Sequence, residues 1–249
     1  MLDVIEQKLK EIEETEKVKI LYCVESGSRA WGFASPDSDY DVRFVYVREK
    51  DYYLRLDATR DVIEWQLDDV LDINGWDVKK ALQLLHKSNP TLFEWNASPI
   101  VYKKAEEWSV ISSLIDECFV GKNGLYHYLN MARTNNREFL QGDRVKLKKY
   151  FYVIRPILAC KWILKNGTPP PMLFDDLAKE CLDEEIREEV DNLLRLKKDT
   201  PELGEGERIE SLNAYIDKNI IKITEEIEKL PTPRHKGWDK LNEIFLSLL

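Results

Sequence analysis

The sequence predicts an α+β fold in which an N-terminal α+β domain, residues 1–104, is followed by an all-helical domain, residues 105–249. Short apolar runs rich in Val, Ile, Phe and Tyr are typical of buried strands, and they are concentrated before residue 105. From about residue 105 onward, apolar residues recur at the three- and four-residue spacing of helices. This change of pattern predicts two domains of different class.

The first domain is expected to begin with a helix, because Leu2, Ile5, Leu9 and Ile12 recur at helical spacing. The further elements expected there are strands over residues 18–25, 41–49, 61–66 and 70–74, a short helix over 28–33 and a helix over 78–87. Asp77 is expected to be the N-cap of that last helix. The later helices are expected to break at three stretches rich in Gly or Pro, residues 121–124, 166–171 and 200–207.

The composition is that of an ordinary soluble globular protein, with 249 residues, 43% hydrophobic and 33% charged. The four cysteines have no paired spacing, which argues against a zinc knuckle, a redox pair or a disulfide framework and predicts a cytoplasmic location. Neither a secretory signal nor an apolar run of the roughly 20 residues that span a bilayer is expected. A net charge of −9 disfavours long nucleic acid over the whole surface but not in a local basic groove.

The stretch ESGSRAWGFASPDSDYDVRFVYV, residues 25–47, contains the candidate functional residues. Asp39 and Asp41 are two residues apart at the start of an expected strand, so their side chains share one face. At about 4 Å and an effective dielectric constant near 20, such charges repel by roughly 4 kcal/mol. Solvent, a basic partner such as Arg43 on the same face, or a divalent ion could compensate. Carboxylate oxygens suit Mg²⁺ or Mn²⁺.

The turn at Gly27 and Ser28 follows the first expected strand and offers backbone N–H groups and a hydroxyl to a phosphate. Taken alone, a Gly-Ser pair is usually only a turn, and two aspartates at a strand start are more often solvated or capping. Together they describe a phosphate cradle beside a two-carboxylate metal site. This combination indicates an enzyme that acts on nucleoside triphosphates.

The arrangement resembles the DNA polymerase β-type nucleotidyltransferase superfamily. The segments GSRAWGFASPDSDYDVR, INGWDVKKALQLLHKSNPTLFEW and KKYFYVIRPILACKW are similar, more narrowly, to predicted nucleotidyltransferases associated with RNA ligases. The resemblance covers about residues 18–165 well and the remainder loosely. It implies a small mixed-sheet, polymerase β-like catalytic domain and a helical domain that closes the nucleotide cleft.

The resemblance also implies roles for single residues. Gly27 and Ser28 match the pair that holds the triphosphate, and Asp39 and Asp41 match the two metal-binding aspartates. A third acid is expected on the next core strand, and Asp72 is the choice because apolar residues flank it. The rivals for this place are Glu64, Asp68 and Asp69.

The cations that complete the phosphate site are sought near the turn and in the helical domain. Arg29 follows the turn directly, and Arg43 either contacts phosphate or forms a structural ion pair with the aspartates. In the helical domain, Arg144, Lys148, Tyr152 and Arg155 have the spacing of one helical stripe, and Lys149 lies beside it. The nucleotide-binding residues expected from this reasoning are Gly27, Ser28, Arg29, Arg43, Lys148, Lys149, Tyr152 and Arg155.

The activity that the resemblance implies is transfer of a nucleoside monophosphate from a triphosphate, by default ATP, to an acceptor hydroxyl with release of pyrophosphate. Mg²⁺ or Mn²⁺ would be held by Asp39, Asp41 and Asp72, and Asp72 is also the expected general base. The acceptor is an RNA end, by analogy with RNA repair, or else a protein hydroxyl or a small molecule. No membrane partner is expected.

Other chemistries lack their motifs. The sequence has no G-x-x-x-x-G-K-[ST], no G-x-G-x-x-G, no H-E-x-x-H and no G-x-S-x-G. The alternative that stays open is a non-catalytic module of the same fold, antitoxin-like, that binds a nucleotide or a protein.

Overall fold

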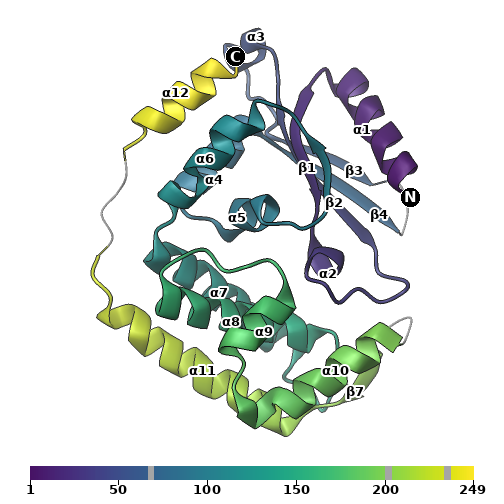
Figure 1. The fold of residues 1–249 in the computed structure, drawn as a ribbon, viewed down its shortest axis with the longest axis vertical. Helices are drawn as coiled ribbons and strands as arrows, with labels where there is room; N and C mark the ends of the chain where they lie inside the picture. The colour runs from purple at the N-terminus through teal and green to yellow at the C-terminus, as the bar shows by residue number, and fades with distance from the viewer. Residues whose placement is uncertain (67–69, 200–203, 233–236) are drawn as a thin grey trace.

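The computed structural model describes residues 1–66, 70–199, 204–232 and 237–249 of the chain. A sheet flanked by helices forms one part of the molecule, and a group of helices forms the other (Figure 1). The α+β fold class expected from the sequence is confirmed. Among the described residues, no helix has the length and apolar character that a membrane-spanning helix needs.

Five strands form the main sheet in the order β3-β4-β2-β1-β5. Their bounds are β1 Lys19–Glu25, β2 Tyr40–Val47, β3 Val62–Gln66, β4 Leu71–Asp77 and β5 Val101–Lys104. The sheet is mixed, because β2 and β4 are parallel while every other neighbouring pair is antiparallel. The parallel register places Asp41 of β2 directly opposite Asp72 of β4.

Alternation along the strands sends apolar side chains to both faces of the sheet. Helix α1, Leu2–Glu16, covers one face with Ile5, Leu9 and Ile12, which pack in one apolar cluster with Val42, Phe44 and Ile73 of the central strands. The other face packs against helices of the same part of the molecule, which are α4 Val78–His86, α5 Pro90–Asn96 and α6 Trp108–Cys118. Two short helices, α2 Gly27–Ala30 and α3 Lys50–Tyr53, lie in the connections before and after β2.

The second group of helices has a separate apolar cluster. It consists of α7 Gly121–Phe139, α8 Lys149–Asn166, α9 Phe174–Cys181, α10 Arg187–Asp199 and α11 Glu210–Lys229, with a 3₁₀ turn over Glu184–Ile186. A two-stranded ribbon pairs β6, Arg144–Lys146, which lies between α7 and α8 in the sequence, with β7, Glu205–Glu207, which lies between α10 and α11. After α11 the chain returns, and α12, Asp239–Ser247, packs Leu241 and Ile244 into the cluster of the sheet (Figure 1). That cluster therefore takes residues from both sides of residue 105.

Several expected elements are found where the pattern predicted them. The N-terminal helix, the four expected strands and the helix capped by Asp77 are confirmed, and the Asp77 side chain accepts a hydrogen bond from the Lys79 backbone N–H at 2.8 Å. The break at residues 166–171 also separates two helices, α8 and α9. Of the stretch 200–207, only residues 204–207 are described, and β7 occupies the last three of them.

Three details differ from expectation. Strand β5 was not predicted, because its sequence VYKK is short and half basic. Residues 121–124 do not interrupt a helix but form the first turn of α7, where the missing side chain of Gly124 leaves room for the Phe119 ring. Arg144 lies in β6, so the predicted helical stripe that joins it to Tyr152 is wrong.

Candidate functional site

The turn after β1 brings backbone into direct contact with a carboxylate. Gly27 has a φ of 60°, a conformation that non-glycine residues rarely adopt. A Cβ atom at this position would lie 2.0 Å from Oδ2 of Asp41. The backbone N–H of Ser26 also donates to the Asp41 carbonyl at 2.8 Å. Glycine is therefore required here for two reasons, its φ and the close approach of Asp41.

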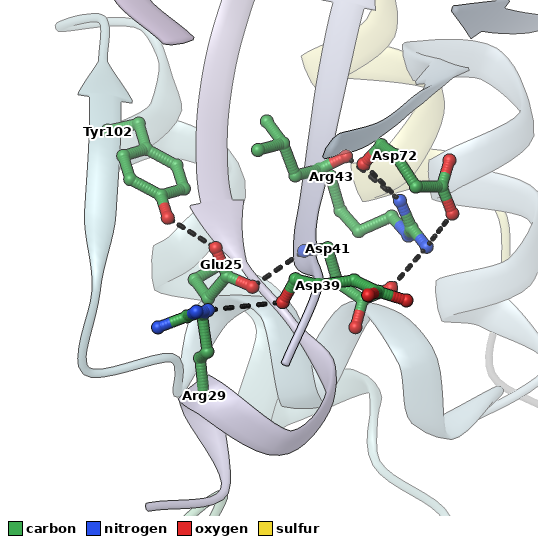
Figure 2. Close-up of polar contacts among 8 residues, drawn as sticks. Glu25, Arg29, Asp39, Asp41, Arg43, Asp72 and Tyr102 are labelled. Carbon is green, nitrogen blue, oxygen red and sulfur yellow. Dashed lines mark hydrogen bonds and ion pairs between the residues drawn. The ribbon is translucent and has the colours of Figure 1, made fainter. Parts of the chain in front are cut away.

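Arg43 joins the aspartates of two neighbouring strands (Figure 2). Its Nη2 donates to Oδ1 of Asp41 at 2.9 Å and to Oδ2 of Asp72 at 2.7 Å. Its Nη1 donates to the carbonyls of Val42 and Asp72, at 3.1 and 2.9 Å. The ion-pair alternative for Arg43 is thus the arrangement observed. It balances part of the repulsion that the carboxylates would otherwise suffer.

The surroundings of Asp41 shift its titration. Burial raises the pKa of the Asp41 carboxyl, Arg43 opposes this rise, and the negative charges of Asp72 and Asp39 add to it. Asp39 itself is exposed and directly precedes β2. The three carboxylates therefore differ in exposure to solvent, from the half-buried Asp41 to the exposed Asp39.

Arg29 contacts the loop that carries Asp39. Its Nε donates to the Asp39 carbonyl at 3.1 Å and its Nη2 to the Ser38 carbonyl at 2.6 Å. The guanidinium carbon lies 3.8 Å from the centre of the Tyr40 ring. These contacts hold the backbone that directly precedes β2, and they use the Arg29 guanidinium for contacts within the protein.

A cleft of about 300 Å³ opens beside these acids. On the side of the sheet it is lined by Ser28, Phe33, Ser35, Asp37, Ser38, Asp39 and Asp41. On the helical side it is lined by Lys148, Tyr152 and Lys197. Burial and the charge of Asp41 raise the pKa of the Tyr152 hydroxyl, so this group stays protonated and able to donate. The cleft joins carboxylates on one wall to cations on the other.

The structure does not bring all the predicted cations to this cleft. Arg155 is only 2% exposed, pairs with Glu94 at 2.8 Å and lies 4.8 Å from the centre of the Trp31 ring. Lys149 lies over the rings of Phe139 and Tyr152, at 3.9 and 4.7 Å from their centres. Neither side chain is among those lining the cleft. Arg155 of the helical part is instead buried against Glu94 of α5 and Trp31, which belong to the sheet part.

The candidates for the third acid are separated by register. Asp72 is the Cα partner of Asp41, whereas Glu64 of β3 is the partner of Asn74 and is exposed. Glu64 is thus one strand further from β2 than Asp72. Asp68 and Asp69 lie outside the described residues.

Two functional candidates were missed by the sequence reasoning. Lys197 reaches the cleft from α10, on a helix whose charge pattern is that of an ordinary solvated face. Glu25, the last residue of β1, is fully buried, and burial raises the pKa of its carboxyl. A carboxylate at the end of an otherwise apolar strand is the only sequence signal that could have identified Glu25.

The donor chemistry of the acids fits a hard divalent cation, although Arg43 now bridges two of them. Arg43 uses one oxygen each of Asp41 and Asp72, and the second oxygens and the exposed Asp39 stand outside its contacts. Within the described ranges, no three His, Cys, Asp or Glu side chains form a ready-made metal cluster.

The turn at Gly27 thus packs on Asp41, and Asp72 lies opposite Asp41 on the neighbouring parallel strand. The chain belongs to the RNA repair pathway DNA polymerase beta family, RlaP, whose model matches residues 1–247. The resemblance inferred from the sequence is thereby confirmed.

One relative is an uncharacterized protein, YcgL, from Bacillus subtilis (strain 168). It is 47% identical over 242 residues, which cover 96% of this chain and 93% of the relative. A nucleotidyltransferase-like protein from Exiguobacterium sibiricum 255-15, known from a crystal structure, aligns over 98% of this chain and 88% of its own with 13% identity and a TM-score of 0.31.

Proposed function

We propose that this protein is a metal-dependent nucleotidyltransferase that moves a nucleoside monophosphate from a nucleoside triphosphate to an acceptor hydroxyl and releases pyrophosphate. The observation that carries the proposal is the cleft itself. It places the Gly27 turn and the acids Asp39 and Asp41 opposite Lys148 and Lys197. A triphosphate needs both walls, because its charge must be neutralised while its α-phosphorus is held beside the acids.

The residues of the chain divide the work. Ser28, Lys148 and Lys197 would bind phosphate oxygens. Asp39, Asp41 and Asp72 would hold Mg²⁺ or Mn²⁺, which when bound supplies charge neutralisation and a lowered pKa of the acceptor hydroxyl. Asp72, whose carboxylate is half exposed, would take the proton from that hydroxyl. Positioning and electrostatics, rather than a covalent enzyme intermediate, would drive the transfer.

For the substrates, we propose ATP as the triphosphate and an RNA end as the acceptor. RNA is supported as the acceptor because the family to which the chain belongs is named for an RNA repair pathway. The net charge of −9 argues against a long duplex, so a short or single-stranded end fits the molecule better.

One observation favours a second candidate, a non-catalytic module that binds a nucleotide or a protein. Arg43 already neutralises Asp41 and Asp72 within the protein, as a site that holds no metal would require. The two candidates differ in a measurable way, because only the enzyme consumes the triphosphate.

The test is to incubate the protein with Mg²⁺ or Mn²⁺, each triphosphate labelled at the α-phosphate, and total small RNA, and to ask which species gains label. Asp39→Asn and Asp41→Asn should each lower pyrophosphate release at least about 100-fold while leaving the fold intact. Near-normal turnover in either variant would refute the site. Absence of label and of pyrophosphate with the parent protein, if it still binds triphosphate, would favour the second candidate.

A further inference from the structure

Glu25 is a buried carboxylate that the proposed chemistry does not use. It is the last residue of β1, its exposed fraction is 0%, and it does not line the cleft. Among the described residues, none of the ion pairs includes it. A buried carboxylate without an ion pair costs free energy unless hydrogen bonds compensate. Its burial therefore has to be compensated by hydrogen bonds.

The hydrogen bonds of Glu25 reach both neighbouring strands (Figure 2). Oε1 accepts the backbone N–H of Asp41, in β2, at 2.7 Å. Oε2 accepts the hydroxyl of Tyr102, in β5. The Glu25 carbonyl accepts the Ser98 hydroxyl at 2.6 Å. The carboxylate thus connects the backbone of Asp41 to the far edge strand of the sheet.

The ladder between β1 and β2 explains why a side chain is needed here. The last Cα pair of the ladder is Glu25 with Val42, and the chain then leaves the sheet through the turn at Gly27. The N–H of Asp41 is consequently satisfied by the carboxylate of Glu25 rather than by a main-chain carbonyl. Two residues later in the chain, Gly27 presses against the carboxylate of the same Asp41.

We propose that Glu25 is a positioning residue for the candidate metal site. By holding the Asp41 backbone, it fixes the direction in which the Asp41 carboxylate leaves the strand, and Tyr102 fixes Glu25 in turn. The inference rests on the proposed function for its consequence, which is metal affinity. The backbone contact itself can be tested without metal.

The chain offers a matched control. Glu13 of α1 makes the same kind of contact at the opposite end of β1, where Oε1 accepts the Ile20 backbone N–H at 2.8 Å and Lys103 donates at 2.6 Å to Oε2. Glu13→Ala therefore removes a carboxylate brace from the same strand without touching the site. Glu25→Ala removes the brace at the site, and Glu25→Gln keeps an oxygen that can accept the Asp41 N–H.

Mn²⁺ affinity is measured by titration with electron paramagnetic resonance, and amide hydrogen exchange of Asp41 by NMR of the metal-free protein. Glu25→Ala should weaken Mn²⁺ binding by about tenfold or more, as the loss of a residue that orients a ligand commonly does. It should also speed the exchange of the Asp41 amide. Glu13→Ala should destabilise the fold but leave Mn²⁺ affinity within about twofold, and Glu25→Gln should retain most of the parent affinity.

Equal Mn²⁺ affinity in Glu25→Ala and Glu13→Ala would overturn the positioning role while leaving the proposed function intact. A parent protein that binds no Mn²⁺ would overturn the proposed function and the role in metal binding together. The amide measurement would then decide separately whether Glu25 braces Asp41, and unchanged exchange in Glu25→Ala would overturn that contact. Should Glu25→Ala fail to fold, Tyr102→Phe serves instead, with Mn²⁺ binding weakened about threefold expected and unchanged binding contradicting the proposal.

Discussion

At the scale of single residues, the missing side chain of Gly27 shapes the candidate site as much as the charged side chains do. Gly27 has no side chain where Asp41 lies, and its φ of 60° is open to few other residues. Gly167, at the end of α8, has a similar φ of 69°, but a Cβ there would meet nothing within 4 Å. The two glycines separate the cost of backbone conformation from the cost of contact with the carboxylate.

Gly27→Ala should therefore affect the candidate site, whereas Gly167→Ala should affect stability alone. Both variants should lose about 1 kcal/mol of unfolding free energy from the unfavourable φ. Only Gly27→Ala should also displace the Asp41 carboxylate and lower Mn²⁺ affinity and turnover by about 100-fold. Denaturant unfolding and Mn²⁺ titration of both variants check this, and equal effects on Mn²⁺ binding would show that Gly27 matters only for its φ.

Much of the candidate site was open to prediction at this scale, but its partners were not. Two-residue spacing was enough to place Asp41 and Arg43 on one face of a strand. The burial of Glu25 and the approach of Lys197 depend on β5 and α10, segments distant in the sequence. Periodicity within one element carries no information about which distant element lies opposite.

At the scale of elements, the parallel register of β2 and β4 decides which acid meets Asp41. The same alternation that buries Leu71 and Ile73 turns Asp72 to the face that carries Asp41 and Arg43. The hairpin to β3 places Glu64 one strand further from β2. The choice of Asp72 from its flanking apolar residues remains a prediction about chemistry, which the following comparison tests.

Asp72→Asn should lower turnover about as much as Asp41→Asn, by roughly 100-fold, because it removes both a carboxylate of the site and a partner of Arg43. Glu64→Gln should be nearly silent in the same assay. A silent Asp72→Asn together with a damaging Glu64→Gln would assign the third acid to β3.

Helix α8 shows where reasoning from one helix failed. Arg155 was expected at the nucleotide, yet it is buried against α5, where the Glu94 carboxylate accepts both Arg155 and the Tyr128 hydroxyl, each at 2.8 Å. Its helical spacing from Tyr152 is real, but α8 is apolar on nearly all sides. A cation on such a helix is directed to the nearest buried acid.

Arg155→Met should cost about 3 kcal/mol of unfolding free energy, because it leaves Glu94 without its cation in a nearly buried position. As a control, Lys165→Met breaks an exposed pair with Glu180 and should cost under about 1 kcal/mol. Denaturant unfolding measures both. A stable Arg155→Met that has lost triphosphate binding would restore Arg155 to the nucleotide site.

At the scale of the whole molecule, the cleft is lined by residues of both the sheet part and the helical part. Helix α2 lies between the two parts (Figure 1). The acids come from the first part, and Lys148 and Lys197 come from the second. The α+β start and the helical continuation were predictable from periodicity. The return of α12 to the sheet was not, because an amphipathic helix does not specify which apolar surface it covers.

A ligand that contacts both parts should stabilise the whole fold. Mg²⁺ or Mn²⁺ with a triphosphate should raise the melting temperature of the parent, since ligand at about 100 times its dissociation constant adds roughly 2.7 kcal/mol. Asp41→Asn should lose most of this gain. Without metal, Asp41→Asn should lose under about 1 kcal/mol of unfolding free energy, because Arg43 keeps Asp72 and two carbonyls as partners. If metal and triphosphate leave the melting temperature of the parent unchanged, and Asp41→Asn is strongly destabilised, then Asp41 serves the ion pair with Arg43 and not a metal site.

The path of the chain to α12 has a consequence for the order in which the protein is made. Leu241 and Ile244 complete the apolar cluster formed by the sheet, α4, α5 and α6, yet the ribosome adds them only after all of α7 to α11. The helical part, whose own cluster contains no residue of α12, can pack while the nascent sheet still lacks these side chains. In this sense the helical part is an insertion into the sheet part, because the chain leaves the cluster of the sheet after α6 and returns to it only with α12.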